Sequence, residues 1–137
     1  MKLEEFSQDD FERASRRLVR SLTRGKTTSS QPKAILLGGQ SGAGKTTIHR
    51  IKQREFQGNI IIIDGDSYRS FHPNYLSLQE KYGKDSVDYT KVFAGKMVEY
   101  LVDELSKQGY HLLIEGTLRT TEVPRKTAQL LAIRGYQ

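Results

Sequence analysis

The segment GQSGAGKT has the residue types and spacing of a phosphate-binding loop. It matches G-x-x-x-x-G-K-[ST] at every fixed position, directly behind the apolar run 34–37. The glycines allow consecutive amides to point at phosphate oxygens, and the following helix adds the positive end of its dipole. We expect Lys45 to reach the β- and γ-phosphates and Thr46 to bind Mg²⁺. The predicted nucleotide contacts are Gly39, Gln40, Ser41, Gly42, Ala43, Gly44, Lys45 and Thr46. A glycine-rich turn that binds nothing is the alternative.

Acidic residues follow the next two apolar runs. Asp64 and Asp66 come after 59–63, and Glu115 comes after 111–114. Because ligands of open α/β sheets bind beyond the carboxyl ends of the strands, we expect these acids to lie near the phosphates. A carboxylate there can accept the proton of an attacking hydroxyl, and Asp66 is preferred over Asp64 for this role. The alternative for Asp-Gly-Asp is simple turn chemistry.

Glu115 ends a strand-like run and therefore resembles an acid that contacts Mg²⁺ through water, although a capping acid in a turn is an equal alternative. Thr117 and Arg119 follow in the loop GTLRT, where alternation would aim both side chains the same way. A hydroxyl and a guanidinium suit a polar, phosphorylated ligand, but the residues alone leave this open. The sequence contains no N-K-x-D motif, which counts against a GTPase.

The elements that must position these residues alternate between helix and strand. Helical periodicity predicts helices over 7–23, 45–56, 87–107 and 122–131, and short apolar runs predict buried strands over 34–38, 59–63 and 111–114. This order predicts an α/β fold with three layers, in which helices flank a mostly parallel sheet, as in P-loop nucleotide-binding proteins. Residues 67–87 show little periodicity, and we expect an irregular connection draped over a ligand.

The first 33 residues are predicted to form an amphipathic helix and a basic linker within a single domain. Ser7 can cap the helix, and Phe11, Ala14, Leu18 and Leu22 form its buried stripe. Seven basic residues and no acid lie between Arg13 and Lys33. A solvated helix face is the simpler interpretation, and a nucleic-acid partner is unlikely because no recognition motif accompanies the charge.

Composition limits the remaining classes. The chain has 137 residues, a net charge of +6 and no cysteine, so disulfides and thiolate metal sites are excluded. No apolar run approaches the roughly 18–20 residues of a membrane span. The amino terminus has no apolar segment typical of a secretory signal. We therefore expect a cytoplasmic protein without a membrane partner.

Several segments together resemble the zeta toxin family of the epsilon–zeta and PezA–PezT toxin–antitoxin systems. They read SLTRGK, AILLGGQSGAGKTTIHRIKQ, IIIDGDSYR, YGKDSVDYTKVFAGKMVEYLV and LLIEGTLRTTEVPRKTAQLL. The resemblance implies a kinase that uses ATP and Mg²⁺ to phosphorylate the 3′-hydroxyl of UDP-N-acetylglucosamine. It also implies that this reaction blocks peptidoglycan synthesis, and that a cognate antitoxin of the epsilon or PezA type blocks the ATP site.

The resemblance assigns roles to particular residues. It implies that Asp66 is the catalytic base and that Lys45 contacts ATP. It further implies that Glu99, Thr117, Arg119 and Thr127 contact the sugar nucleotide together with Asp66. Helical periodicity alone would leave Glu99 as a surface acid and Thr127 as an ordinary helix residue.

The family's pattern continues beyond the point where this sequence stops. Family members add further strands and helices and arginines that clamp the transferring phosphate, so we expect a chain that lacks the family's C-terminal portion. Two alternatives to the kinase remain. One is a shortened chain that binds nucleotide or antitoxin without efficient turnover, and the other is a different small-molecule kinase of similar fold.

Overall fold

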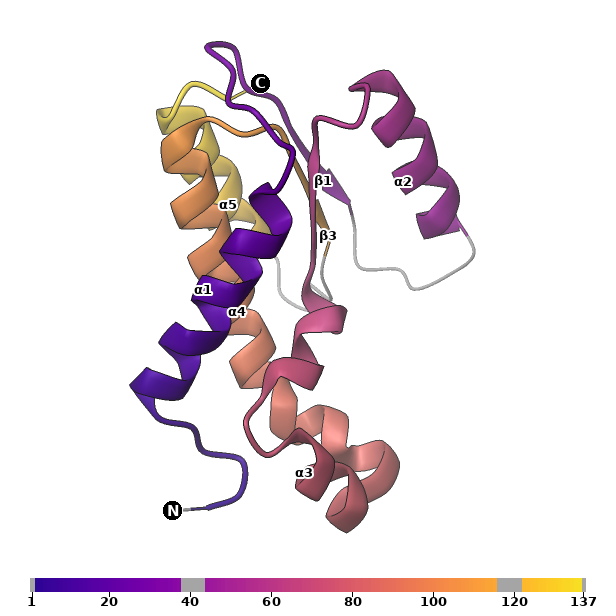
Figure 1. Cartoon of the computed structure of the whole chain (residues 1–137), viewed down its shortest axis with the longest axis vertical. Helices are drawn as coiled ribbons and strands as arrows, with labels where there is room; N and C mark the ends of the chain where they lie inside the picture. Colours follow the sequence, from indigo (N-terminus) through magenta and orange to yellow (C-terminus); the bar gives the residue numbers. More distant parts are fainter. Residues whose placement is uncertain (1, 38–43, 116–121, 137) are drawn as a thin grey trace.

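Helices cover both faces of a small parallel sheet. The computed structural model describes residues 2–37, 44–115 and 122–136. The elements are α1 (Gln8–Thr23), β1 (Ala34–Leu37), α2 (Gly44–Glu55), β2 (Ile61–Asp64), η1 (Gly65–Phe71), α3 (Tyr75–Tyr82), η2 (Gly83–Asp85), α4 (Ser86–Gln108), β3 (Leu112–Glu115) and α5 (Glu122–Ile133). Figure 1 shows α2 on one side of the strands and α1, α4 and α5 on the other. The predicted three-layer α/β fold is confirmed.

The strand order places the last strand of the described chain in the middle of the sheet. The order is β1-β3-β2, and both neighbouring pairs are parallel. In this register Glu115 pairs with Leu37 on one side and with Asp64 on the other. The carboxyl ends of all three strands therefore lie level at one edge of the sheet.

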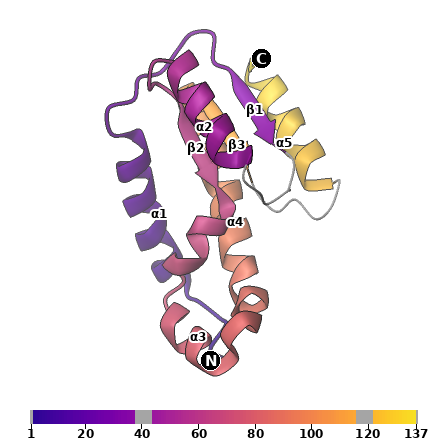
Figure 2. The same cartoon turned by 90° about the vertical axis from the view of Figure 1, so that its right-hand side faces the viewer.

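The core lies between the sheet and α4, which crosses behind the strands between α1 and α5 (Figure 2). Phe93, Met97, Leu101 and Leu105 of α4 are all completely buried. They recur at the predicted helical spacing, although Tyr89, which belongs to the same stripe, is only half-buried. None of the described helices, the long α4 included, is long and apolar enough to cross a membrane.

Two local signals that the sequence predicted set the ends of helices. The Ser7 hydroxyl accepts the Asp10 amide at 3.0 Å and so caps α1. Gly109 ends α4 in the left-handed conformation with φ of 90°, and a Cβ there would come within 3.0 Å of the Ser29 carbonyl oxygen. Glycine is therefore required for both its conformation and its lack of a side chain.

The predicted stripe of α1 is confirmed, and the segment after it contacts the turn before β2. Phe11, Ala14 and Leu18 are buried, and Leu22 is half-buried. Beyond the helix, the Lys26 ammonium donates to the Gly58 carbonyl, and the side chain of Asn59 bonds Thr27 in both directions. Part of the basic linker thus has defined partners.

Two predictions about local structure are wrong. The segment 67–87 is mostly helical, because η1, α3 and η2 lie within residues 65–85. Each of these helical pieces is too short to display an apolar stripe, so periodicity could not reveal them. The strand predicted over 34–38 is present as β1, with Gly38 outside the described residues, but it is half-buried instead of fully buried, with Leu36 37% exposed. Among the described strands β1 lies at an edge of the sheet, but so does the more deeply buried β2, so an apolar run alone does not reveal how far a strand is buried.

Candidate functional site

The level carboxyl ends of the strands bring the predicted acids to one edge of the sheet. β1 ends at Leu37, which pairs with Glu115 of the central strand. On the other side of Glu115, β2 ends at Asp64, and Asp66 follows in the first turn of η1. This arrangement confirms the expectation that Asp64, Asp66 and Glu115 gather at the carboxyl edge.

Only the end of the predicted phosphate loop falls in the described chain. Gly39, Gln40, Ser41, Gly42 and Ala43 lie outside the described residues. α2 begins at Gly44, so Lys45 and Thr46 belong to its first turn, and the Thr46 side chain is exposed. The amino terminus of this twelve-residue helix faces the loop, where its dipole favours an anion.

Glu115 contacts α2 across the layers. Its side chain is only 1% exposed, and its Oε2 meets Nε2 of His49. His49 follows Thr46 by three positions, so the two side chains share one face of α2. The contact therefore brings the Glu115 carboxylate toward the helix face that carries the Thr46 hydroxyl.

The Glu115 carboxylate and the Thr46 hydroxyl suit Mg²⁺ as ligands. This ion binds oxygen atoms, and it usually uses one or two protein groups together with phosphates and water. Thr46 and Glu115 would be the protein groups that hold it. The described residues contain no cluster of three or more His, Cys, Asp or Glu side chains that could hold a metal ion. The predicted magnesium site would therefore need the nucleotide phosphates as further ligands.

Asp66 is held at two points. Its backbone amide donates to Oδ1 of Asp64 at 3.2 Å, so Asp64 caps η1. Its side chain accepts from Nη2 of Arg69 at 2.9 Å. The turn chemistry that was the alternative for Asp-Gly-Asp is thus present at Asp64, and it fixes the backbone of the predicted base.

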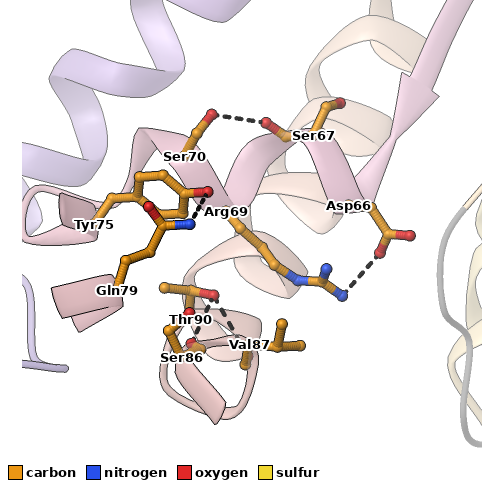
Figure 3. Close-up of a pocket in the computed structure, with 9 residues that line it drawn as sticks. All are labelled: Asp66, Ser67, Arg69, Ser70, Tyr75, Gln79, Ser86, Val87 and Thr90. Atoms are coloured by element: carbon orange, nitrogen blue, oxygen red, sulfur yellow. Dashed lines mark hydrogen bonds and ion pairs between the residues drawn. The ribbon is translucent and has the colours of Figure 1, made fainter. Parts of the chain in front are cut away.

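A hollow of about 360 Å³ opens beside Asp66, between η1, α3 and the start of α4 (Figure 3). Eight of its nine lining residues carry polar side chains, although apolar atoms form slightly more of its surface than polar atoms. Its lining consists of Asp66, Ser67, Arg69, Ser70, Tyr75, Gln79, Ser86, Val87 and Thr90. Within it the Gln79 amide donates to the Tyr75 hydroxyl at 2.8 Å. The chemistry of this hollow suits a polar ligand with many oxygen atoms.

Tyr68 belongs to η1, the segment that carries Asp66, and packs into the hydrophobic core. It is 3% exposed, and burial raises the pKa of its hydroxyl well above the ordinary value. The hydroxyl therefore stays protonated at neutral pH. Asp66 and Arg69 are the charged groups that this 3-10 helix presents to the hollow.

The remaining predicted contacts lie on α4, on α5 and in a segment outside the described residues. Glu99 is exposed on α4, and its side chain makes no hydrogen bond or ion pair with another described residue. Thr127 is half-buried on α5. Thr117 and Arg119 lie outside the described residues. The structure thus describes the predicted base and its surroundings, whereas the assignment of these four residues to the sugar nucleotide stays a prediction.

Two residues with a part in this geometry were absent from the sequence-based site. His49 contacts a residue 66 positions away, and no local pattern could indicate that contact. Arg69 follows Asp66 by three positions, a spacing that joins side chains only when the segment is helical. Recognising residues 65–71 as helical would have identified Arg69.

Comparison with known proteins places the chain in a family. The family model described as "Zeta toxin" matches residues 18–137. The chain is 69% identical to Toxin PezT of Streptococcus pneumoniae serotype 4 over its whole length, and 42% identical to Toxin zeta of Streptococcus pyogenes over 132 residues. The α/β fold and its phosphate-loop motif define a P-loop protein, and the chain belongs to the zeta toxin family.

A solved structure supports the same conclusion. A chain from a study titled "Molecular and structural characterization of the PezAT chromosomal toxin-antitoxin system of the human pathogen Streptococcus pneumoniae" superposes with a TM-score of 0.95 at 70% identity. The superposition covers 99% of this chain and 56% of the other. Likewise, the chain covers 54% of Toxin PezT and 46% of Toxin zeta. It therefore spans about half the length of the curated relatives it matches.

Proposed function

We propose that this chain carries the nucleotide site and the catalytic base of an ATP-dependent kinase that phosphorylates the 3′-hydroxyl of UDP-N-acetylglucosamine. The main support is the strand register, in which Leu37, Glu115 and Asp64 lie side by side at the carboxyl ends of their strands. Since the phosphate loop follows Leu37 and the base follows Asp64, donor and acceptor sites lie on either side of one central strand. Membership in the zeta toxin family supports the reaction class.

Each predicted group has a task in this reaction. Lys45 and the amides of the loop bind the β- and γ-phosphates, and Thr46 and Glu115 hold Mg²⁺. When bound, Mg²⁺ would neutralise part of the negative charge of the phosphates. Asp66 accepts the proton of the acceptor hydroxyl, and it faces a hollow lined with polar groups that can receive a sugar nucleotide. Glu99, Thr117, Arg119 and Thr127 complete the acceptor contacts in this proposal.

The direct test is a coupled kinase assay with ATP, Mg²⁺ and UDP-N-acetylglucosamine. Loss of a general base typically lowers a rate by roughly 10²–10⁴-fold, and we expect Asp66→Asn to fall in this range. Lys45→Ala should abolish detectable turnover, because it removes the point charge on the transferring phosphate. Exposed residues on other surfaces offer matched controls. Asp9→Asn on α1 and Lys107→Ala on α4 should retain the wild-type rate.

The outcomes separate the proposal from its alternatives. Turnover of other sugars without turnover of UDP-N-acetylglucosamine would identify a different small-molecule kinase. A folded wild-type chain that binds ATP but phosphorylates no acceptor would contradict the kinase function. Equal rates for Asp66→Asn and Asp9→Asn would remove Asp66 from the reaction even if the chain is active.

The biological role in this proposal is that of the toxin in a cytoplasmic toxin–antitoxin pair. Depletion of UDP-N-acetylglucosamine would block peptidoglycan synthesis, and an antitoxin of the epsilon or PezA type would cover the ATP site. The similarity to a chain from the PezAT system supports this partner class. Addition of the cognate antitoxin should therefore inhibit the kinase assay in competition with ATP, and inhibition insensitive to ATP concentration would contradict this mode.

A further inference from the structure

Arg69 lies next to the proposed base in a way that the phosphate-loop chemistry does not use. Its Nη2 donates to Oδ1 of Asp66 at 2.9 Å, and the two side chains are 21% and 33% exposed. Both belong to η1 and line the hollow, and Figure 3 shows the guanidinium extending along its wall to Asp66. The pair is therefore part of the wall beside which an acceptor hydroxyl must be placed.

The contact leaves Asp66 with one held oxygen and one open oxygen. Among the described residues, Arg69 is the side chain that bonds the Asp66 carboxylate, and Oδ2 has no hydrogen-bond partner. The backbone of Asp66 is held separately, through its amide and Oδ1 of Asp64. With the backbone and Oδ1 both fixed, the direction in which Oδ2 points is fixed as well.

We propose that Arg69 is a positioning residue, which binds one oxygen of Asp66 so that the other faces the hydroxyl to be phosphorylated. This inference rests on the proposed kinase function and adds a residue to it. A base acts only when its free lone pair lies within hydrogen-bond reach of the proton, so a carboxylate free to rotate spends less time in the productive geometry. The guanidinium restricts that rotation.

Two observations distinguish this pair from the other ion pairs of the same spacing. Arg13 and Asp10 on α1 lie 3.8 Å apart at the surface, and Lys91 and Asp88 on α4 lie 3.9 Å apart with both side chains more than half exposed. Lys52 and Glu55 on α2 lie 2.9 Å apart, but their side chains are 30% and 56% exposed, so Arg69 and Asp66 are the least exposed of these pairs. Arg69, by contrast, has a buried Nε that finds no hydrogen-bond partner among the residues that the structure describes. A buried unsatisfied donor is unfavourable for stability, so the placement of Arg69 is explained better by its contact with Asp66 than by its own packing.

The test is a double-mutant cycle on turnover with Arg69→Met, Asp66→Asn and the double variant. Arg69→Met keeps the apolar stem and should lower kcat by about 10–100-fold while the KM for ATP stays within about twofold, because orientation matters in the transition state. Arg69→Lys keeps the charge and an N–H group that can donate to Asp66, and it should recover most of the loss. In the Asp66→Asn background, Arg69→Met should change the remaining rate by less than about twofold.

A matched control variant and a folding check exclude nonspecific causes of a lower rate in the double-mutant cycle. Arg13→Met removes the other arginine–aspartate pair of this spacing and should leave kcat unchanged. Thermal melting of every variant verifies the fold, and Arg69→Gln replaces Arg69→Met if the latter does not fold.

The outcomes distinguish this inference from the proposed function. Suppose that the wild type phosphorylates UDP-N-acetylglucosamine or another sugar. If the fold-reductions in kcat of Arg69→Met and Asp66→Asn then multiply in the double variant, Arg69 acts independently of Asp66, and only this inference is overturned. An effect on the KM for ATP alone, or equal losses in Arg69→Lys and Arg69→Met, overturns it too. If the wild type phosphorylates no acceptor, the kinase function and this inference fall together.

Discussion

The two faces of the sheet are covered very differently. On the face of α1, α4 and α5, Ile61, Ile63, Leu112 and Ile114 belong to one buried cluster with the α4 stripe and α1. On the face of α2, none of the side chains described in that helix, residues 46–55, is buried, and Ile51 is 56% exposed. The alternation of side chains along β3 separates the two environments within four residues.

One face of the sheet mainly stabilises the fold, whereas the other carries residues of the candidate site. Leu112 and Ile114 point into the apolar cluster, whereas Glu115 points the other way and meets His49 of α2. Apolar burial on the first face stabilises the sheet, since it removes much of the apolar surface from water. The second face carries α2, the helix that follows the predicted phosphate loop, and none of the side chains described in α2 is buried, although Leu113 and Glu115 beneath it are.

The sharpest test of this comparison pairs one apolar side chain from each face. Phe93 of α4 is fully buried and contacts the rings of Phe6 and Phe11 edge-on, so Phe93→Ala should lower the free energy of unfolding by about 3–5 kcal/mol. Ile51→Ala on α2 should cost less than about 1 kcal/mol, because much of that side chain is already in water. Urea denaturation measures both. Similar losses for the two variants would contradict the comparison.

A smaller effect is expected where α5 joins the packed face. The guanidinium of Arg134 donates to Oδ1 and the carbonyl oxygen of Asp103 and to the hydroxyl of Ser106. Arg134→Met removes these hydrogen bonds and should cost about 1–3 kcal/mol in urea denaturation, whereas Lys107→Met on the exposed side of α4 should cost far less.

The same contact predicts a pH dependence. The hydrogen bond from Arg134 is the main reason why the pKa of Asp103 lies below its ordinary value of 3.8. A lowered pKa in the folded state gives stability that is present above 3.8 and is lost as the pH falls through the folded pKa. The stability difference between wild type and Arg134→Met should therefore narrow in acid. A difference that is constant down to strongly acidic pH would contradict this contribution.

The smallest effect is expected on the α2 side, at His111. Its Nδ1 accepts the Lys33 amide at 3.0 Å, and its ring lies 5.0 Å from that of Phe56, just after α2. Burial and the charge of Lys33 lower the pKa of His111 below its ordinary value of 6.5. The unfolded chain therefore binds a proton more readily, and stability should decrease as the pH falls below 6.5.

His111→Asn provides the matched comparison, because the amide oxygen of asparagine can accept the same bond without titrating. Thermal melts between pH 7.5 and 5.5 should show a slope in the wild type that is reduced in the variant. Identical slopes would place the titration elsewhere. A steeper slope in the variant would contradict the direction of the shift.

Much of the fold was predictable because its signals are local. The cap at Ser7, the stripe from Phe93 to Leu105 and the terminating Gly109 depend on residues within a few turns of one another. The resemblance to zeta toxins likewise rests on contiguous segments, and the comparisons confirm it. The short helices within 65–85 were missed, since they display no stripe and depend on packing against α4 and on hydrogen bonds such as that from Arg69 to Asp66.

The candidate site divides in the same way. Residue types and spacing were enough to predict a phosphate loop with Lys45 and Thr46 and to single out Asp66 and Glu115, because a phosphate site needs glycines, a lysine and a hydroxyl in consecutive order. The strand order that levels Glu115 with Asp64, and the contact of Glu115 with His49, join residues about 50 to 70 positions apart. Only the tertiary structure decides such contacts, because parallel strands pair across long connections whose sequences do not encode which neighbour each strand will find.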